Sequence, residues 1–243
     1  MGRRRRKKSY LGDVIIFFAM FYAAIIYVTF KTLTFFISMI AFYSSGYKGK
    51  SGNGFFRTYF NKGVNGEYKL YRKVKKVFGK EYILTNIYLP SKSIDNTEID
   101  VLAVKNGRIY CFEMKNYAGY IYGDGDGTYW TQVLRYKTKN KFYNPFRQNY
   151  AHKKALEEYL GVDENTIIPI VVFSNRANLQ NVKKVNGNIY LLKNLKFDFR
   201  FDTYNDTEIA NRDMSIIDKL KVRTLMDDKI KQEHIEQVHM LKE

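Results

Sequence analysis

The apolar and polar positions of this chain fall into one long uniform block followed by shorter patterned segments. Between Val14 and Tyr43 the sequence is apolar except for Lys31 and a few Ser and Thr residues. A membrane span needs about 20 apolar residues, so we predict a transmembrane or membrane-embedded helix. A cleaved secretory signal is the alternative, but the block is long for one and no convincing cleavage site follows it.

Positive charge flanks both ends of this block. Residues Arg3 to Lys8 are all cationic, which favours a cytoplasmic N-terminus, but Lys48 and Arg57 follow on the other side. Lys31 is also a candidate turn of a shallow re-entrant hairpin. The sequence therefore predicts contact with membrane lipid through this helix, single-pass or re-entrant, and leaves open the side on which the rest of the chain lies.

The remaining segments have the periods of alternating helices and strands. Apolar positions recur at helical spacing in some segments, and at strand spacing or in continuous runs in others. Ser44 to Gly54 is rich in Gly and Ser and predicts a flexible linker. We predict helices over 65–78 and 144–160, strands over 81–89, 119–122, 128–136, 167–173 and 188–192, an edge strand from Phe197 to Phe201, and a mostly helical tail over 206–241.

The clearest local signal is a pair of predicted strands over 98–115. Two runs of β-branched and aromatic residues flank Asn106-Gly107. This dipeptide favours a two-residue type I′ turn, because both of its positions need positive φ. The sequence therefore predicts a β-hairpin in which Lys105 lies opposite Arg108.

This register brings charged side chains together on one face of the hairpin. Asp100 lies opposite Glu113, and Lys115 projects from the same face because side chains alternate with period two. Directly opposed carboxylates have Cβ atoms about 5 Å apart and repel unless something positive lies between them. A divalent cation would remove that repulsion, whereas a solvated strand face is the alternative. Ile109 and Cys111 share the face and favour a covered site.

Two further polar side chains lie on faces that are otherwise apolar. Glu67 falls on the inner side of the predicted helix 65–78, either as an acid that complements the helix dipole or as a second acid near the hairpin. Gln148 lies on the inner stripe of helix 144–160. It is either a buried amide that satisfies backbone groups or a polar contact in a site.

Charge indicates a polyanionic partner. The 243 residues include 41 Lys and Arg against 24 Asp and Glu, a formal net charge of +17, which fits nucleic acid or an anionic membrane surface. One Cys and three scattered His exclude a disulfide framework and a zinc cluster. Trp130 and neighbouring tyrosines could stack on bases, although packing within a sheet is the commoner use. The candidate nucleic-acid contacts are Lys69, Arg72, Lys73, Lys76 and Arg147.

Several short motifs follow one another in a single collinear order. They are Gly66-Glu67 opening a helix, Glu98-Ile99-Asp100, Glu113-Met114-Lys115-Asn116, Gly119, Trp130, Asn144-Pro145-Phe146-Arg147-Gln148 and Pro169 to Phe173. In this order the sequence resembles the nuclease-related domain (NERD) family, a branch of the PD-(D/E)xK nuclease superfamily. The resemblance covers roughly residues 65–173, and the collinear set is far more specific than any one motif.

The resemblance implies an α/β (α+β) fold: a restriction-endonuclease-like αβββαβ core with a central mixed sheet, preceded here by the transmembrane helix. Carried over by position, it implies catalytic roles for Asp100, Glu113, Lys115, Glu67 and Gln148. It also implies a Mg²⁺ ion, or Mn²⁺ in its place, held by Asp100, Glu113 and Glu67, with Lys115 orienting the attacking water. The implied partner is nucleic acid, DNA rather than RNA.

The sequence thus predicts five parts. They are a basic head over 1–12, a membrane helix over 13–43, a linker over 44–60, a NERD domain over 61–195 and a mostly helical extension over 196–243. We expect a membrane-anchored, Mg²⁺-dependent nuclease. A non-catalytic, membrane-tethered nucleic-acid-binding module on the same fold and a lipid-surface interaction protein are the alternatives.

Overall fold

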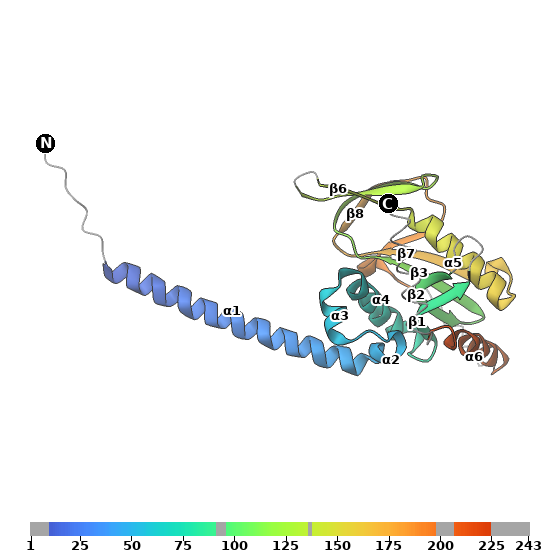
Figure 1. The fold of residues 1–243 in the computed structure, drawn as a ribbon, viewed down its shortest axis with the longest axis horizontal. Helices are drawn as coiled ribbons and strands as arrows, with labels where there is room; N and C mark the ends of the chain where they lie inside the picture. The colour runs from blue at the N-terminus through green and yellow to red at the C-terminus, as the bar shows by residue number, and fades with distance from the viewer. Residues whose placement is uncertain (1–9, 91–95, 136–137, 198–206, 225–243) are drawn as a thin grey trace. The chain divides into compact units, whose positions relative to one another are not determined.

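The computed structural model describes residues 10–90, 96–135, 138–197 and 207–224. It divides into two units, residues 1–45 and 46–243. In the first unit, α1 (Tyr10–Ser45) is one helix, and its segment Gly12–Ser45 is long and apolar enough to cross a membrane (Figure 1). The helix continues through Lys31, so the turn considered there is absent. The basic head, Arg3 to Lys8, lies outside the described residues.

The second unit is built on a five-stranded mixed sheet in the order β1-β2-β3-β7-β9. β1, β2 and β3 are antiparallel, and β7 and β9 add in parallel beside β3. The predicted αβββαβ order is confirmed as α4, β1, β2, β3, α5 and β7, with other elements inserted. The elements are α4 (Lys62–Phe78), β1 (Ile83–Pro90), β2 (Asn96–Lys105), β3 (Arg108–Lys115), α5 (Pro145–Leu160), β7 (Ile167–Phe173) and β9 (Asn188–Leu191).

The central hairpin has the predicted turn and register. Asn106 and Gly107 have φ values of 53° and 71°, as a type I′ turn requires. Lys105 pairs with Arg108, and the ladder continues to the pair Val101–Phe112, where it ends. The two strands therefore stop pairing just before the level of Asp100.

Helices cover both faces of this sheet (Figure 1). Cys111 and its neighbours on one face form a core with Ala155 and Leu156 of α5 and with Ile217 of α6 (Thr207–Lys221). On the other face of β3, the Tyr110 ring packs against Phe78 of α4 with centroids 5.1 Å apart. Burial of these apolar faces stabilises the layered arrangement.

A second sheet of four strands extends from the first. Its order is β6-β5-β4-β8, and the parallel pair β4–β8 follows β3 and β7 along the chain. The sequence predicted β4 and β5 but neither β6 nor β8, whose polar residues give no clear strand pattern. The strands are β4 (Gly119–Asp124), β5 (Tyr129–Val133), β6 (Lys139–Tyr143) and β8 (Ala177–Lys183).

The prediction of a flexible linker is wrong, and the predictions for the C-terminal segments are only partly tested. The segment 44–60, predicted as a flexible linker, forms the end of α1 and the short helices α2 (Tyr47–Ser51) and α3 (Phe55–Phe60). Gly46 directly follows α1 and Gly52 directly follows α2, and both adopt left-handed conformations. Each glycine therefore ends a helix. The edge strand expected up to Phe201 falls largely outside the described residues, as does the tail beyond 224.

The C-terminal helix α6 is part of the core. Ile216, Ile217 and Leu220 pack in the main hydrophobic cluster, and Asp213 accepts a hydrogen bond of 2.9 Å from the backbone N–H of Gly107. The helix therefore fixes the turn of the central hairpin. The sequence predicted its helicity but not this packing.

Candidate active site

Three of the predicted side chains form one contact network where β3 ends. The Lys115 ammonium lies 2.6 Å from Glu113 Oε1 and donates a hydrogen bond of 2.8 Å to Gln148 Oε1. Glu113 is only 1 % exposed. Asn144 caps the start of α5 by accepting a hydrogen bond from Phe146 N, which fixes the first turn, where Gln148 lies.

Asp100 joins the network where the β2–β3 ladder ends. Its Oδ2 accepts a hydrogen bond of 2.7 Å from the backbone N–H of Met114. The simple alternation used to place Asp100 is wrong at this point of β2. Ile99 packs in the same core cluster as Leu102, and strict alternation would put these two residues on opposite faces. The alternation of side chains along β2 is therefore interrupted between Ile99 and Leu102, and Asp100 lies at this interruption.

The backbone of β1 changes at the same level. Asn86 lies between the pairs Thr85–Val101 and Ile87–Ile99, across from Asp100, and has a positive φ of 52°. Such a conformation is uncommon for a residue other than Gly and is often found at functional sites. The change of face in β2 accompanies this left-handed residue in β1.

Glu67 lies on α4, close enough to Asp100 for its carboxylate to raise the pKa of that acid. Burial, followed by the nearby Glu98 carboxylate, raises the pKa of Glu67 to about 7. The Tyr47 hydroxyl donates to Glu67 Oε2 over 3.4 Å, which places the segment predicted as a linker at the edge of the site. Glu98 in turn accepts hydrogen bonds of 2.8 Å from Asn86 Nδ2 and from the Tyr88 hydroxyl.

His152 is the main residue that sequence reasoning missed. It is buried, its Nε2 lies 3.0 Å from Glu113 Oε2, and its Nδ1 lies 2.8 Å from Thr97 Oγ1. An ionised carboxylate can only accept, so Nε2–H donates to Glu113. The signal was available, because His152 follows Gln148 by one helical turn and therefore lies on the same face of α5.

Two comparisons with known proteins found a match. The family model described as "Nuclease-related domain" matches residues 62–174. Residues 62–174 are therefore similar to nuclease-related domains. The chain is also similar to an uncharacterized protein of Bacillus anthracis, with 29 % identity over 180 residues, 73 % of this chain and 84 % of that protein. No solved structure matches the chain significantly.

The charges within the candidate site are unevenly balanced. Burial, and then the carboxylates of Glu113 and Glu67, raise the pKa of Asp100 well above its usual range. Burial alone would raise the pKa of Glu113, but the Lys115 ammonium and the hydrogen bond with His152 outweigh burial and lower it. Burial opposes the charge of Lys115, but the Glu113 carboxylate outweighs burial and raises its pKa. Glu113 and Lys115 are thus an ion pair beside two acids whose pKa values are raised.

These residues fit a hard divalent cation by their chemistry. Among the described residues, no three His, Cys, Asp or Glu side chains converge closely enough to form a ready-made metal site. The donors around Asp100 are nevertheless carboxylate oxygens, which Mg²⁺ prefers. Burial, and then neighbouring carboxylates, raise the pKa of Asp100 and of Glu67, and a bound cation would favour the ionised form of both acids. Both Glu113 oxygens already accept hydrogen bonds, but each oxygen has a second lone pair.

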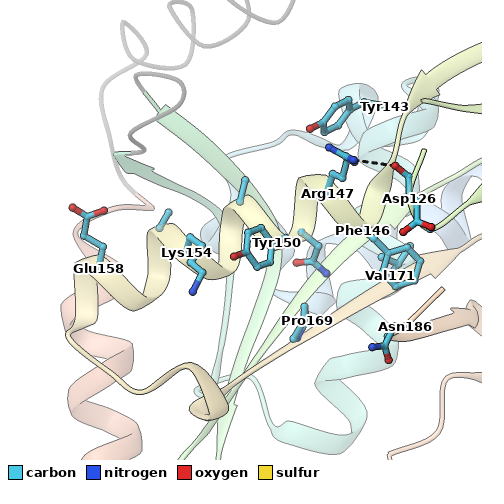
Figure 2. Close-up of a pocket in the computed structure, with 15 residues that line it drawn as sticks. Asp126, Tyr143, Phe146, Arg147, Tyr150, Lys154, Glu158, Pro169, Val171 and Asn186 are labelled. Atoms are coloured by element: carbon cyan, nitrogen blue, oxygen red, sulfur yellow. Dashed lines mark hydrogen bonds between the residues drawn. The ribbon is translucent and has the colours of Figure 1, made fainter. Parts of the chain in front are cut away.

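The predicted nucleic-acid contacts are divided between two helices. Lys69, Arg72, Lys73 and Lys76 lie on α4, and the Arg72 guanidinium lies over the Tyr68 ring at 5.7 Å. Arg147 lies on α5, where it donates a hydrogen bond of 2.9 Å to the backbone oxygen of Asp126. It lines a cavity of about 690 Å³ between α5, β7 and two loops (Figure 2). None of the five predicted catalytic residues lines that cavity, so Arg147 belongs to a different surface.

Proposed function

We propose that this protein is a membrane-anchored, Mg²⁺-dependent nuclease that hydrolyses phosphodiester bonds of DNA. The observation that carries the proposal is the contact network of Asp100, Glu113, Lys115 and Gln148 inside a nuclease-related domain. Buried charged groups are expensive in free energy. Their concentration at one strand end therefore supports a chemical role better than a structural one.

Each side chain has a role that its contacts support. Asp100, Glu113 and Glu67 would hold the cation, which polarises the phosphoryl oxygens and acidifies water when it is bound. Lys115 has three N–H donors, of which Glu113 and Gln148 take two. The third is available to a phosphoryl oxygen or to the attacking water.

Gln148 and His152 act on this arrangement from α5. Gln148 Oε1 accepts from Lys115 and restricts the direction of its ammonium. His152 donates to the second oxygen of Glu113 and so restricts rotation of that carboxylate. In the reaction, a water molecule releases a proton to solvent as its oxygen forms a bond to phosphorus, and the bond from phosphorus to the leaving sugar oxygen breaks. That oxygen takes up a proton from solvent.

The apolar helix and the positive charge support the proposed membrane anchor and the proposed nucleic-acid substrate. α1 anchors the domain, because its segment Gly12–Ser45 has the length and hydropathy of a span. The net charge of +17 attracts the phosphate backbone through the exposed cations of α4, with an affinity that falls steeply with salt.

The test uses the full chain in detergent micelles. Supercoiled, linear and single-stranded DNA, and RNA, are incubated with Mg²⁺ or EDTA beside Asp100→Asn and the control Asp218→Asn, an exposed acid on α6. We expect Mg²⁺-dependent cleavage that Asp100→Asn abolishes and Asp218→Asn retains. Intact DNA that all three proteins shift equally in a gel would replace the nuclease with a binding module. Binding only to anionic vesicles would favour a lipid-surface protein.

A further inference from the structure

The second sheet has an outer face on which tyrosines gather. In the sheet register, Tyr129 pairs with Tyr143, and Tyr120 and Tyr122 pair with Val133 and Thr131 of β5. Paired residues project from the same face of a sheet. All four tyrosines therefore lie on one face, with exposed fractions of 52 % for Tyr120, 45 % for Tyr122, 60 % for Tyr129 and 45 % for Tyr143. We call these four residues the tyrosine face.

The tyrosine face is not required by the core of the second sheet. The opposite face already carries a closed cluster in which Ile121 and Trp130 are fully buried, and Trp130 stacks on Phe173 with ring centroids 6.2 Å apart. The packing interpretation of Trp130 is therefore confirmed, whereas its tyrosine neighbours project outward. Neighbouring exposed aromatics of this kind mark a contact surface more often than a structural feature.

Charge identifies the kind of partner. The four strands of this sheet carry Lys139, Lys141 and Lys183 and one acid, Asp124. Lys141 pairs with Thr131 and Lys139 with Val133, so both lysines share the face of the tyrosines and both are exposed. Aromatic rings interleaved with lysines on a sheet complement a ligand that offers flat rings and negative charge along one chain.

We propose that the tyrosine face binds single-stranded nucleic acid by stacking unpaired bases on its rings. In a duplex the bases are stacked on one another and their flat faces are not accessible, so a duplex offers this surface only its phosphates. A single strand offers bases to the tyrosines and phosphates to Lys139 and Lys141.

The chain connects this face directly to the candidate active site. β3 ends at Lys115 and β4 begins at Gly119, and the bend between the sheets is held by hydrogen bonds from Ser174 to Lys115 O and Tyr117 O. If the proposed nuclease function holds, the bound strand is the substrate or the unpaired flank of one. Tyr143 also lines the cavity that contains Arg147, shown in Figure 2, which extends the surface towards α5.

The test measures binding without cleavage. Fluorescence anisotropy of the full chain in detergent and EDTA is recorded with a labelled oligothymidylate and with a duplex of the same length. Tyr122→Leu and Tyr129→Leu remove the rings, Tyr122→Phe and Tyr129→Phe retain them, and Tyr59→Leu on α3 is the matched control, with 42 % exposure in the native chain.

We expect the single strand to bind about tenfold more tightly than the duplex, and each Leu variant to weaken that binding about five- to tenfold. The Phe variants and Tyr59→Leu should bind as the native chain does. Equal affinity for both ligands, no binding, or Leu variants that bind as the native chain would each overturn the proposal. If native protein binds the strand through these tyrosines but cleaves no nucleic acid, the nuclease proposal fails and the tyrosine face stands.

Discussion

The two sheets of this protein each contain a parallel pair of strands, β3–β7 in the first and β4–β8 in the second, but their side chains are used in opposite ways. In the five-stranded sheet, Glu113 and Lys115 are held in a network of charged contacts, with Glu113 almost fully buried. In the four-stranded sheet, the buried face is apolar and aromatic around Trp130, while Tyr122 and Tyr129 are exposed.

The difference shows where each kind of function can be located. Burying a carboxylate and an ammonium requires compensating contacts, so the charged network can be disrupted by a single substitution. Exposed tyrosines contribute little to folding, and their substitution should affect contacts with a partner instead. We therefore expect large effects on chemistry in the first sheet and small effects on stability in the second.

The largest effect is expected at Lys115. Lys115→Met removes the cation beside Glu113 and should lower DNA cleavage by at least about 10³-fold, because the transition state loses its preorganised positive charge. The double variant Glu113→Gln/Lys115→Met removes both charges of the ion pair and should fold while remaining inactive. Lys105→Met, at the other end of the hairpin, is the control and should retain activity. Plasmid nicking measures all three, and an active Lys115→Met protein would contradict the role of Lys115.

A smaller effect is expected at His152. His152→Ala should lower kcat about 10- to 100-fold, because Glu113 loses the donor that fixes one of its oxygens. His152→Gln provides an amide N–H at a similar reach and should restore part of that loss. KM for DNA should change little in either variant. If the Gln and Ala variants are equally impaired, His152 supports only the packing of α5.

Glu67 should make the stability of the cation-free protein depend on pH. Its pKa is about 7 in the folded state and ordinary in the unfolded chain. The protonated side chain therefore stabilises the folded state. This contribution is fully present at a pH below the pKa of Glu67 in the unfolded chain, and it is lost as the pH rises through about 7. The glutamine of Glu67→Gln cannot ionise. Between about pH 5 and 8 in EDTA, the free energy of unfolding of this variant should therefore fall by about 1 to 3 kcal/mol less than that of the native chain. The raised pKa of Asp100 acts in the same direction and leaves part of the slope.

Denaturant titrations at several pH values measure this difference. Glu164→Gln is a matched control, because Glu164 is exposed and its contact with Lys154, at 3.7 Å, is peripheral. Identical pH profiles for Glu67→Gln and the native chain would contradict the assignment of the raised pKa to Glu67.

The smallest effect is expected in the second sheet. Tyr122→Leu should change the free energy of unfolding by no more than about 0.5 kcal/mol, because the side chain is exposed. Trp130→Ala, on the inner face of the same sheet, should destabilise by about 3 to 5 kcal/mol. Denaturant unfolding of both variants tests the contrast. A large loss of stability in Tyr122→Leu would assign the tyrosines to folding.

The sequence predicted the turn and register of the central hairpin better than the path of β2 beyond Val101. Turn chemistry at Asn106-Gly107 fixed the register, and that register placed Glu113 and Lys115 on one face of β3, where they are in contact. It did not foresee Asn86, whose left-handed conformation lies where β2 changes face. A tertiary constraint of this kind leaves no periodic signal.

The flanking segments were harder to predict for a related reason. Gly46 and Gly52 suggested flexibility by composition, but their positions at the two ends of α2 make them helix terminators. Tyr47 is fully buried, and a sequence pattern cannot show that a residue in a Gly-rich segment reaches Glu67. His152 was predictable in principle from its spacing to Gln148, because one helical turn separates them.

The most direct test of the account is binding of Mn²⁺ to the full chain in detergent, followed by electron paramagnetic resonance. The account predicts saturable Mn²⁺ binding that Mg²⁺ displaces and that Asp100→Asn weakens at least about tenfold, because the cation loses a carboxylate ligand. The control Asp218→Asn should bind as the native chain does. Equal Mn²⁺ affinity in Asp100→Asn and the native chain would contradict the claim that this network is a divalent-cation site.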